Sequence, residues 1–333
     1  MNRKLILSIL LLAGACSPQG VSQPAVGAEL PPSPVSRCMN LGGSLEAPNE
    51  GDWGYTVREA DLKRIKAAGF DTVRLPVKWS AHAKSLPPYT IDPTIIARVK
   101  EIVAQADRAG LQTIVDLHHY DELMDNPQAH YDRLYAMWEQ IAAAFQDAPD
   151  SLILELLNEP RDRMTAGRTD RVNEKLLEIV RAYHPDRWVI VGGANWGNLD
   201  ALLESRPPED DRILLTFHSY APYEFTHQGA SFLNPPPKTG RTWGADEEVR
   251  ALKAAAAAAA RFGAQEGHPM LLGEFGVYED VPLAERVKWT RAVRETAEDY
   301  GIGWCYWDYA TTFKAYIPER ETWINSLLSA LID

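Results

Sequence analysis

The sequence predicts an α/β protein with the architecture of a (β/α)8 barrel, or TIM barrel, in a single domain. Short apolar runs rich in leucine and β-branched residues alternate with stretches of helical periodicity, which is typical of parallel strands connected by helices. Eight such units fit into about 300 residues, the size expected of a closed barrel. The competing open, doubly wound sheet usually carries a G-x-G-x-x-G loop after its first strand, and residues 38–43 do not supply one.

The amino-terminal residues are expected to direct export rather than to form part of the barrel. Arg3 and Lys4 precede an apolar run over residues 5–13, and small residues follow, which is the pattern of a signal peptide over residues 1–16. The apolar run is too short to span a bilayer. Residues 13–16 also resemble a bacterial lipobox, although Ala13 stands where leucine is usual. We therefore expect a periplasmic or cell-surface protein attached to a membrane through a lipidated Cys16, with plain secretion as the alternative.

The remaining chain divides into a tether and the barrel. Residues 17–36 contain Pro, Ser and Gly without an apolar period and are expected to form a flexible tether, so the barrel would cover residues 37–333. An alanine run over residues 254–260 is a strong helix former within a helical pattern. Amphipathic helical stretches include residues 57–68, 95–109 and 131–145. The predicted strands cover residues 38–41, 72–76, 113–117, 151–157, 188–191, 213–217, 270–273 and 303–307.

Composition narrows the class of ligand. The 333 residues are 45% hydrophobic, enough for one sizeable core. The net charge of −12 argues against nucleic acid as a partner, since binding phosphates depends on Lys and Arg. Ten Trp and thirteen Tyr supply more aromatic faces than a core demands, and stacking on sugar rings is one use for them. A neutral ligand therefore fits the composition better than an anionic polymer.

Polar residues collect at the carboxyl ends of the predicted strands. A single His or Glu at a strand end is usually a satisfied hydrogen-bonding residue. Such residues follow seven of the eight strands, however, and in a barrel those ends share the face on which active sites are built. They are Asn40, Arg74, His118 with His119, Asn158 with Glu159, His218 with Tyr220, Glu274, and Trp307 with Asp308.

Two carboxylates on that face point to glycoside hydrolysis. Glu159 and Glu274 end the fourth and seventh strands, which face each other across a barrel. Cleavage of a glycosidic bond needs one carboxyl group to protonate the leaving oxygen and another to attack or stabilise the anomeric carbon. Arg74 can keep one of them ionised, while reduced solvation raises the pKa of the other. The spacing alone does not assign the two roles.

Several stretches carry a resemblance to glycoside hydrolase family 5, the barrel cellulases and mannanases with an Asn-Glu-Pro motif. Here that motif is Asn158-Glu159-Pro160, and the similarity extends over residues 38–332. The segments NLGGSLEAPNEGDWG (40–54), VRLP (73–76), HHYDELM (118–124), FTHQGA (225–230) and GEFG (273–276) resemble the thermophilic endoglucanase branch that also handles glucomannan.

The resemblance implies a role for each active-site residue. It makes Glu159 the general acid/base and Glu274 the nucleophile of a retaining reaction. The rest of the family's pattern matches Arg74, His118, Asn158, His218, Tyr220 and Trp307. Further sugar contacts are expected at Asn40, Glu46, His119, His227, Trp243 and Asp308. Asp308 stands where the related branch usually has Glu, which leaves the substrate preference at that position open.

The expected activity is therefore that of a retaining endo-β-1,4-glucanase acting on β-glucan or glucomannan, as a monomer and without a cofactor. A β-mannanase, a xyloglucanase and a non-catalytic carbohydrate-binding barrel are the alternatives. No metal site is expected, because adjacent strand residues such as His118 and His119 point to opposite faces. Glu155 would be a paired structural carboxylate in the barrel interior. Cys38 and Cys305 lie on neighbouring strands, but side chains of adjacent barrel strands alternate between layers, so free thiols are expected.

Overall fold

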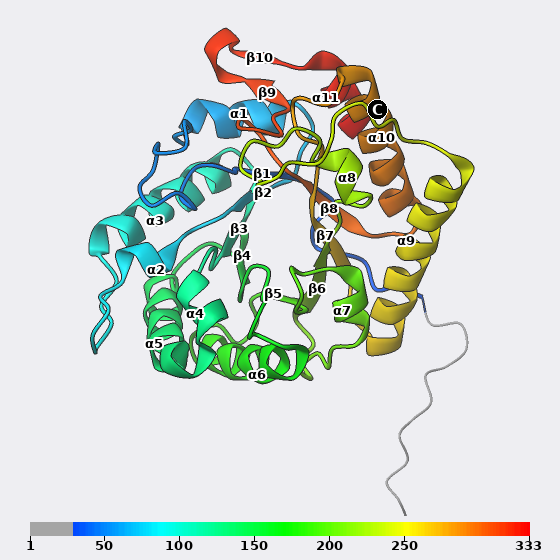
Figure 1. Cartoon of the computed structure of the whole chain (residues 1–333). Coiled ribbons are helices and arrows are strands. Elements are labelled where there is room, and N and C mark those ends of the chain that lie inside the picture. Colours follow the sequence, from blue (N-terminus) through cyan, green and yellow to red (C-terminus); the bar gives the residue numbers. More distant parts are fainter. Residues whose placement is uncertain (1–28) are drawn as a thin grey trace, which may run out of the picture.

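The computed structural model describes residues 29–333, and these form a closed barrel of eight parallel strands (Figure 1). The strands run in sequence order around the barrel, and the first pairs with the last. The predicted fold class is confirmed, and each predicted strand overlaps an observed one. The strands are β1 (Arg37–Asn40), β2 (Thr72–Leu75), β3 (Gln112–Asp116), β4 (Leu152–Glu155), β5 (Val189–Gly192), β6 (Ile213–His218), β7 (Met270–Phe275) and β8 (Gly303–Tyr306).

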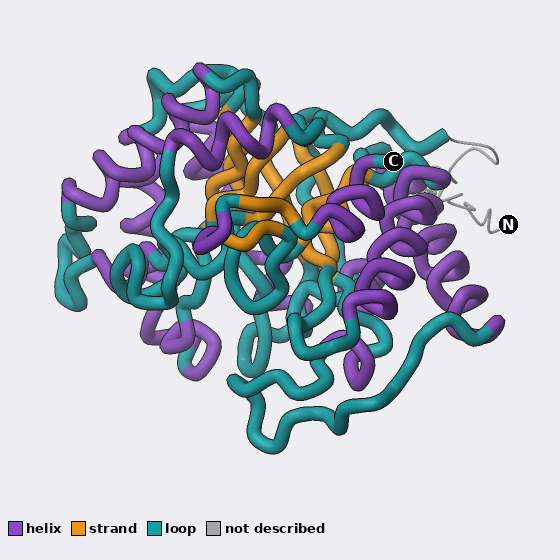
Figure 2. The backbone as a smooth tube through the Cα atoms, turned by 90° about the horizontal axis from the view of Figure 1, so that it is seen from above, coloured by secondary structure: helices purple, strands orange, loops and turns teal. Residues whose placement is uncertain are grey.

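Helices surround the strands (Figure 1), and the view from above shows helices on either side of the strands with loops gathered below them (Figure 2). The longer ones are α1 (Glu59–Ala67), α3 (Pro93–Arg108), α5 (Pro127–Ala144), α6 (Ala166–Tyr183), α9 (Asp246–Glu266), α10 (Leu283–Asp299) and α11 (Asn325–Ile332). Short elements occupy the connections: α2 (Trp79–His82), α4 (Asp121–Asp125), α7 (Leu199–Leu203), α8 (Tyr223–Thr226), the 3-10 turn η1 (Pro318–Arg320), and the hairpin of β9 (Tyr316–Ile317) with β10 (Thr322–Trp323). Among residues 29–333, no helix is long and apolar enough to cross a membrane.

Local sequence signals explain where the helices begin and end. Asp92 caps α3 by accepting a 2.8 Å hydrogen bond from the Thr94 amide, and Pro93 occupies the first turn. Gly267 ends α9 at a φ of 77°, a conformation that glycine adopts without strain. Helix α5 begins four residues before its expected start, because Pro127 suits a first turn.

The hydrophobic core has two layers. One lies between the strands and the helices, and the other fills the barrel interior with Val35, Cys38, Ile114, Ile153, Ile190, Leu214, Leu271 and Cys305. Val35 is fully buried although it precedes β1, and Leu30 also packs against the core. The expected tether over residues 17–36 is therefore wrong at its end, because residues 30–36 belong to the folded domain. The predicted signal peptide, Cys16 and residues 17–28 lie outside the described part of the chain.

A disulfide joins Cys38 to Cys305 across the seam between β1 and β8. The expectation of free thiols is wrong, because the two strands pair with Cys38 directly opposite Cys305. Their Cα atoms are 4.1 Å apart, and both side chains lie in the interior layer. Alternation between layers, on which the expectation was based, does not hold at this pair.

Candidate active site

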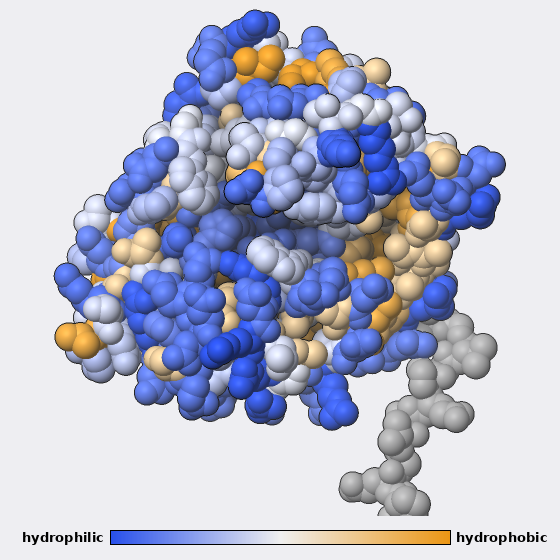
Figure 3. Space-filling view, viewed as in Figure 1, coloured by the Kyte–Doolittle hydropathy of each residue, from blue (hydrophilic) through white to orange (hydrophobic). Residues whose placement is uncertain are grey.

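The carboxyl ends of the strands and the loops that follow bring most of the predicted site residues to one end of the barrel (Figure 1). In the same view, the molecular surface is hollowed near its middle and is mostly hydrophilic there (Figure 3). Many of the buried polar residues lie at these strand ends, and most of their polar atoms have hydrogen-bond partners.

Arg74, fully buried at the end of β2, is the centre of the polar network. Its guanidinium makes a bidentate ion pair with Glu155, with both N–O distances at 2.7 Å, and a second ion pair with Asp116 at 2.8 Å. The expectation that Glu155 is a paired structural carboxylate is confirmed. The carboxylates on β3 and β4 thus hold the Nε and Nη2 side of the guanidinium in place. Nη1 is left to contact Glu274.

Glu274, at the end of β7, makes an ion pair with the Nη1 side of the Arg74 guanidinium. Arg74 Nη1 lies 2.7 Å from Glu274 Oε1, and the Tyr220 hydroxyl donates to Oε2 at 2.9 Å. Burial opposes ionisation of this side chain. The charges of His218 and Arg74 outweigh the burial and lower the pKa of Glu274 to about 2. Glu274 is therefore ionised at every ordinary pH, as a nucleophilic carboxylate has to be.

Glu159 has the opposite electrostatic character. It follows β4 with a φ of 44°, a strained conformation for a residue with a side chain, of the kind that gathers at functional sites. Burial raises the pKa of Glu159, and the neighbouring charge of Glu274 raises it further, against the hydrogen bond from His218 Nδ1 at 2.8 Å. One carboxyl oxygen each of Glu159 and Glu274 lie within 4.8 Å of one another. Two close carboxyls with oppositely shifted pKa values form an acid–nucleophile pair.

His118 and Asn158 lie beside this pair. His118 Nδ1 is held by Asp116 Oδ2 at 2.7 Å, and its Nε2 lies 3.3 Å from the Asn158 side-chain nitrogen. Burial and the charge of Arg74 keep the pKa of His118 well below its usual range. The His118 ring stacks on Trp307 with 5.9 Å between centroids, so Trp307 forms one wall of the same space.

Asn40 and Asp308 differ from the expectation of sugar contacts. Asn40 is fully buried beneath the site, where it accepts from Arg74 and donates to the carbonyls of Gly273 and Tyr306. Asp308 is also fully buried, and its carboxylate accepts hydrogen bonds from the backbone amide and the hydroxyl of Thr311. Both side chains therefore support the site from behind rather than face its open space.

The other expected sugar contacts fall into two groups. His227 stacks on Tyr223 with 4.2 Å between centroids and meets the ring of Tyr220 edge-on, which joins it to the catalytic side chains. Trp243 is buried at 5% exposure in the long loop before α9, where its amide donates to Glu285 of α10. No hydrogen bond or ring stacking among the described residues joins Trp243 to the carboxylate pair.

Glu46 and His119 approach His118 from a third side. One ligand atom from each of the three residues lies within 4.8 Å of the others. The expectation that the two histidines point to opposite faces is wrong, because β3 ends at Asp116 and His119 has a left-handed φ of 48°. Burial raises the pKa of Glu46 well above its usual value and lowers that of His119 to about 3.

Three residues in and around the site were missed from the sequence. Asp116 orients His118, and the signal for it was a carboxylate two positions earlier on the same strand face. Trp53 and Trp196 are exposed at 48% and 54%, each beside a glycine in a loop after a strand. Trp196 lies next to the acid/base candidate, since its amide donates to the Pro160 carbonyl at 3.1 Å. The feature visible in the sequence is a Trp followed by a glycine in a loop after a predicted strand.

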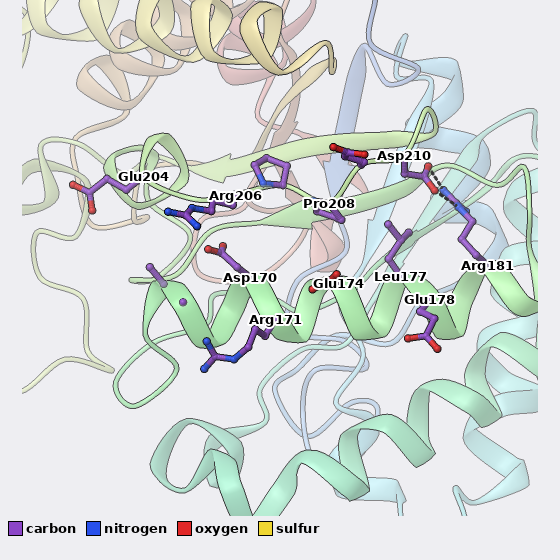
Figure 4. A pocket seen from close by; sticks show the side chains of 14 residues that line it. Asp170, Arg171, Glu174, Leu177, Glu178, Arg181, Glu204, Arg206, Pro208 and Asp210 are labelled. Carbon is purple, nitrogen blue, oxygen red and sulfur yellow. Dashed lines mark hydrogen bonds and ion pairs between the residues drawn. The ribbon is translucent and has the colours of Figure 1, made fainter. Parts of the chain in front are cut away.

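A separate groove lies between α6 and residues 204–210 (Figure 4). This groove of about 930 Å³ is lined by acidic and arginine side chains, among them the ion pair of Arg181 with Asp210. None of its lining residues belongs to the carboxylate network, so its size does not make it the candidate active site.

Comparisons with known proteins agree with this geometry. The family model "Cellulase (glycosyl hydrolase family 5)" matches residues 37–312. Endoglucanase H of Acetivibrio thermocellus is 34% identical over 88% of this chain, and cellulase/esterase CelE of the same organism is 29% identical over 81%. The chain spans only about a third of those two relatives, 32% and 35% of their lengths.

Solved structures match over most of both chains. Endoglucanase Cel5A of Thermotoga maritima in complex with cellobiose has a TM-score of 0.88 and 37% identity, and covers 90% of this chain and 97% of its own. The same protein has also been solved with mannotriose. The cellulose synthase subunit Z of Clostridioides difficile has a TM-score of 0.87 and 34% identity, with 90% and 100% of the two chains covered.

Proposed function

This chain belongs to glycosyl hydrolase family 5, the cellulase family, and from that premise we propose that it is an endo-β-1,4-glucanase that retains the anomeric configuration. The observation that carries the proposal is the pair of neighbouring carboxyls with opposite pKa shifts, Glu159 raised and Glu274 lowered, with oxygens less than 5 Å apart. A separation of about 5–5.5 Å is typical of retaining enzymes, whereas inverting enzymes leave room for a water between the two groups.

In the first step, ionised Glu274 attacks the anomeric carbon while protonated Glu159 donates its proton to the leaving glycosidic oxygen. This forms a covalent glycosyl-enzyme and releases the first product. In the second step, Glu159, now ionised, takes a proton from water, and that water displaces Glu274 from the anomeric carbon. The two inversions leave the product in the β configuration, and each carboxyl returns to its starting state.

The surrounding residues prepare these two states. Arg74 and Tyr220 hold the Glu274 carboxylate at 2.7 and 2.9 Å, so it is oriented and ionised before substrate arrives. His218 bonds to Glu159 at 2.8 Å and adjusts its acidity. Asn158, oriented by Arg74 at 2.7 Å, is placed to bind the 2-hydroxyl of the sugar, and Trp307 supplies an apolar wall for the ring.

The proposed substrates are β-1,4-linked glucan and glucomannan. Support comes from the endoglucanases among the relatives and from the cellobiose and mannotriose complexes of the Thermotoga maritima enzyme. A β-mannanase or a xyloglucanase would use the same catalytic pair. A non-catalytic binding barrel is disfavoured because both carboxylates and their supporting groups are present.

The test compares release of reducing ends from carboxymethylcellulose, barley β-glucan, glucomannan, galactomannan and xyloglucan. We expect β-glucan and glucomannan to be cut fastest, with a rapid fall in viscosity, since an endo-acting enzyme shortens chains early. Preference for galactomannan or xyloglucan would select one of the alternatives. Inactivity on all five polymers, by a correctly folded protein, would contradict the proposed activity.

We also propose that the chain is exported and anchored through a lipidated Cys16, and that it acts as a monomer. The signal pattern supports export, and a buried disulfide suits an oxidising compartment. Labelled palmitate should enter the wild-type protein in a bacterial host and not the Cys16→Ser variant. Labelling of both, or of neither, would contradict lipidation at this residue. Light scattering after gel filtration measures the molar mass of the Cys16→Ser protein. We expect the mass of a single chain.

A further inference from the structure

Glu46, His118 and His119 form a converging group of metal-ligand side chains beside the catalytic pair. One carboxylate oxygen and two imidazole nitrogens lie within 4.8 Å of one another. Glu46 is 3% exposed and His118 2% exposed, so the group is largely shielded from bulk water. Zinc bonds of about 2.0–2.2 Å hold neighbouring ligand atoms about 3.4 Å apart, so small side-chain rotations would close the group around one ion.

One carboxylate oxygen of Glu46 is a buried, unsatisfied hydrogen-bond acceptor. The atom is Oε2, which has no hydrogen-bond partner among residues 29–333. A buried carboxylate oxygen without a partner is unfavourable, so this atom is expected to bind something that enters the site from outside. A sugar hydroxyl would satisfy it with one hydrogen bond, and a cation would satisfy it more strongly.

His118 is already arranged as metal-ligating histidines usually are. Asp116 Oδ2 holds its Nδ1 at 2.7 Å, which fixes the ring orientation and leaves Nε2 as the nitrogen that can bind a metal. A carboxylate behind the ligating imidazole is the common supporting arrangement of zinc sites. In the described part of the chain, the hydrogen bond to be exchanged at Nε2 is the long one to Asn158, at 3.3 Å.

The second group with suitable spacing, Glu159, His218 and Glu274, is a poorer site. His218 Nδ1 is engaged by Glu159 at 2.8 Å, and both Glu274 oxygens are engaged, by Arg74 and by Tyr220. The Arg74 guanidinium in direct contact would also repel a divalent cation. The two groups therefore differ in the availability of their ligand atoms, although their spacing is alike.

We propose that Glu46, His118 and His119 bind one divalent transition-metal ion, of which zinc is the reference, and that the bound ion inhibits the enzyme by occupying the sugar-binding space. Two imidazoles and a carboxylate suit zinc, which in sites with three protein ligands takes water as the fourth. The ion has no part in the reaction. Its effect is to remove Glu46 and both histidines from substrate binding, so glycan and metal exclude one another.

The test measures zinc binding directly, by titration calorimetry with zinc chloride, on the folded chain carrying Cys16→Ser. That background removes the thiol outside the disulfide, which would otherwise bind zinc itself. We expect one zinc per chain. Glu46→Gln and His119→Gln should each weaken binding by at least about tenfold, since even supporting residues of metal sites are worth 10–100-fold. His227→Gln and Glu159→Gln serve as matched controls and should bind as the parent does.

The outcomes separate this site from its alternatives. Undiminished binding in Glu46→Gln and His119→Gln would overturn the proposal, as would loss of binding in Glu159→Gln, which points to the catalytic pair instead. Thermal melts identify a misfolded variant, and either of the two ligand variants is sufficient for the test. Because binding is measured without substrate, its failure leaves the proposed hydrolysis untouched. Where hydrolysis is observed, zinc should raise the apparent KM and leave kcat unchanged, and a chelator should reverse the effect.

Discussion

At the scale of single residues, the two catalytic carboxyls should respond differently to removal. Glu274→Ala should lose almost all turnover, and azide should restore part of it by attacking from the α face. Glu159→Ala should lose about 10²–10⁴-fold on polymer, the usual size of general acid catalysis, and much less on aryl glycosides whose leaving groups need no proton. Initial rates on both substrates check this. Asp170→Asn, in the remote groove of Figure 4, is the control that should keep parental rates.

The pH dependence of kcat/KM should reflect the ionisation of the same two carboxyls. Activity requires Glu274 ionised, so the acidic limb of kcat/KM falls only as the pH approaches about 2. Activity also requires Glu159 protonated, so the alkaline limb falls as the pH rises through the raised pKa of Glu159.

His218 hydrogen-bonds Glu159 and holds its pKa down, so His218→Asn should move the alkaline limb to higher pH. His268→Asn, at a histidine that precedes β7 at the opposite end of the barrel, should leave both limbs in place. A fall in rate with no movement of the alkaline limb would show that His218 has only a structural role.

Asp308 should govern stability rather than the choice of sugar. Asp308 is fully buried and packs closely on Gly42, where an added Cβ would lie 3.0 Å from the Asp308 Cβ and 3.2 Å from its Oδ2, so the extra methylene of Asp308→Glu has to displace its neighbours. We expect a loss of about 1–3 kcal/mol in the free energy of unfolding and equal relative rates on matched gluco- and manno-oligosaccharides. Denaturant titration and oligosaccharide kinetics provide the two measurements. A change in the ratio of the two rates would restore Asp308 as a specificity residue.

These residues also mark the limit of what the sequence predicted. Residue type and position after a strand were enough to bring Arg74, Glu159 and Glu274 together. The burial of a strand-end side chain was not predictable. Asn40 and Asp308 lie at strand ends, as Glu159 and Glu274 do, yet both are fully buried. The direction of His119 depends on one left-handed φ that no pattern in the sequence specifies.

At the scale of elements, the seam between β1 and β8 is the place to test what closes the barrel. The disulfide links residues 267 apart, and removing a native disulfide typically costs 2–5 kcal/mol. The double variant Cys38→Ala/Cys305→Ala should therefore unfold at lower denaturant concentration. Dithiothreitol should destabilise the parent and leave the double variant unchanged. Equal effects of the reductant on both would contradict a stabilising bond.

The strands were predicted to within two residues at almost every end, because continuous apolar runs bounded by helical periodicity are a strong signal. The register between β1 and β8 was not predicted, because the pairing of the first and last strands depends on the closure of the whole barrel. The disulfide was missed for that reason. The packing of Val35 inside the barrel was missed because a single valine in a Pro- and Ser-containing segment carries no periodicity.

At the scale of the whole molecule, stability should rise on mild acidification. Burial raises the pKa of Asp308 to about 6, so the folded state takes up a proton there at a pH where the unfolded state does not. Stability from this group is present below the unfolded pKa near 3.8 and is lost as the pH rises through about 6, by up to roughly 3 kcal/mol. The melting temperature should be higher at pH 5 than at pH 7.5. Asp308→Asn, which cannot titrate, should reduce that difference, and an unchanged difference would assign it to other groups.

The entry of Val35 into the barrel also fixes the end of the barrel at which the amino-terminal segment joins the domain. Residues 30–36 lead into the amino end of β1, and the catalytic carboxyls follow the carboxyl ends of β4 and β7. Chain attachment and bond cleavage are therefore at opposite poles of the barrel. A protein held at a bilayer through its amino terminus would have its attachment point at the end away from the cleft, which leaves the cleft free for polymer too large to approach the lipid.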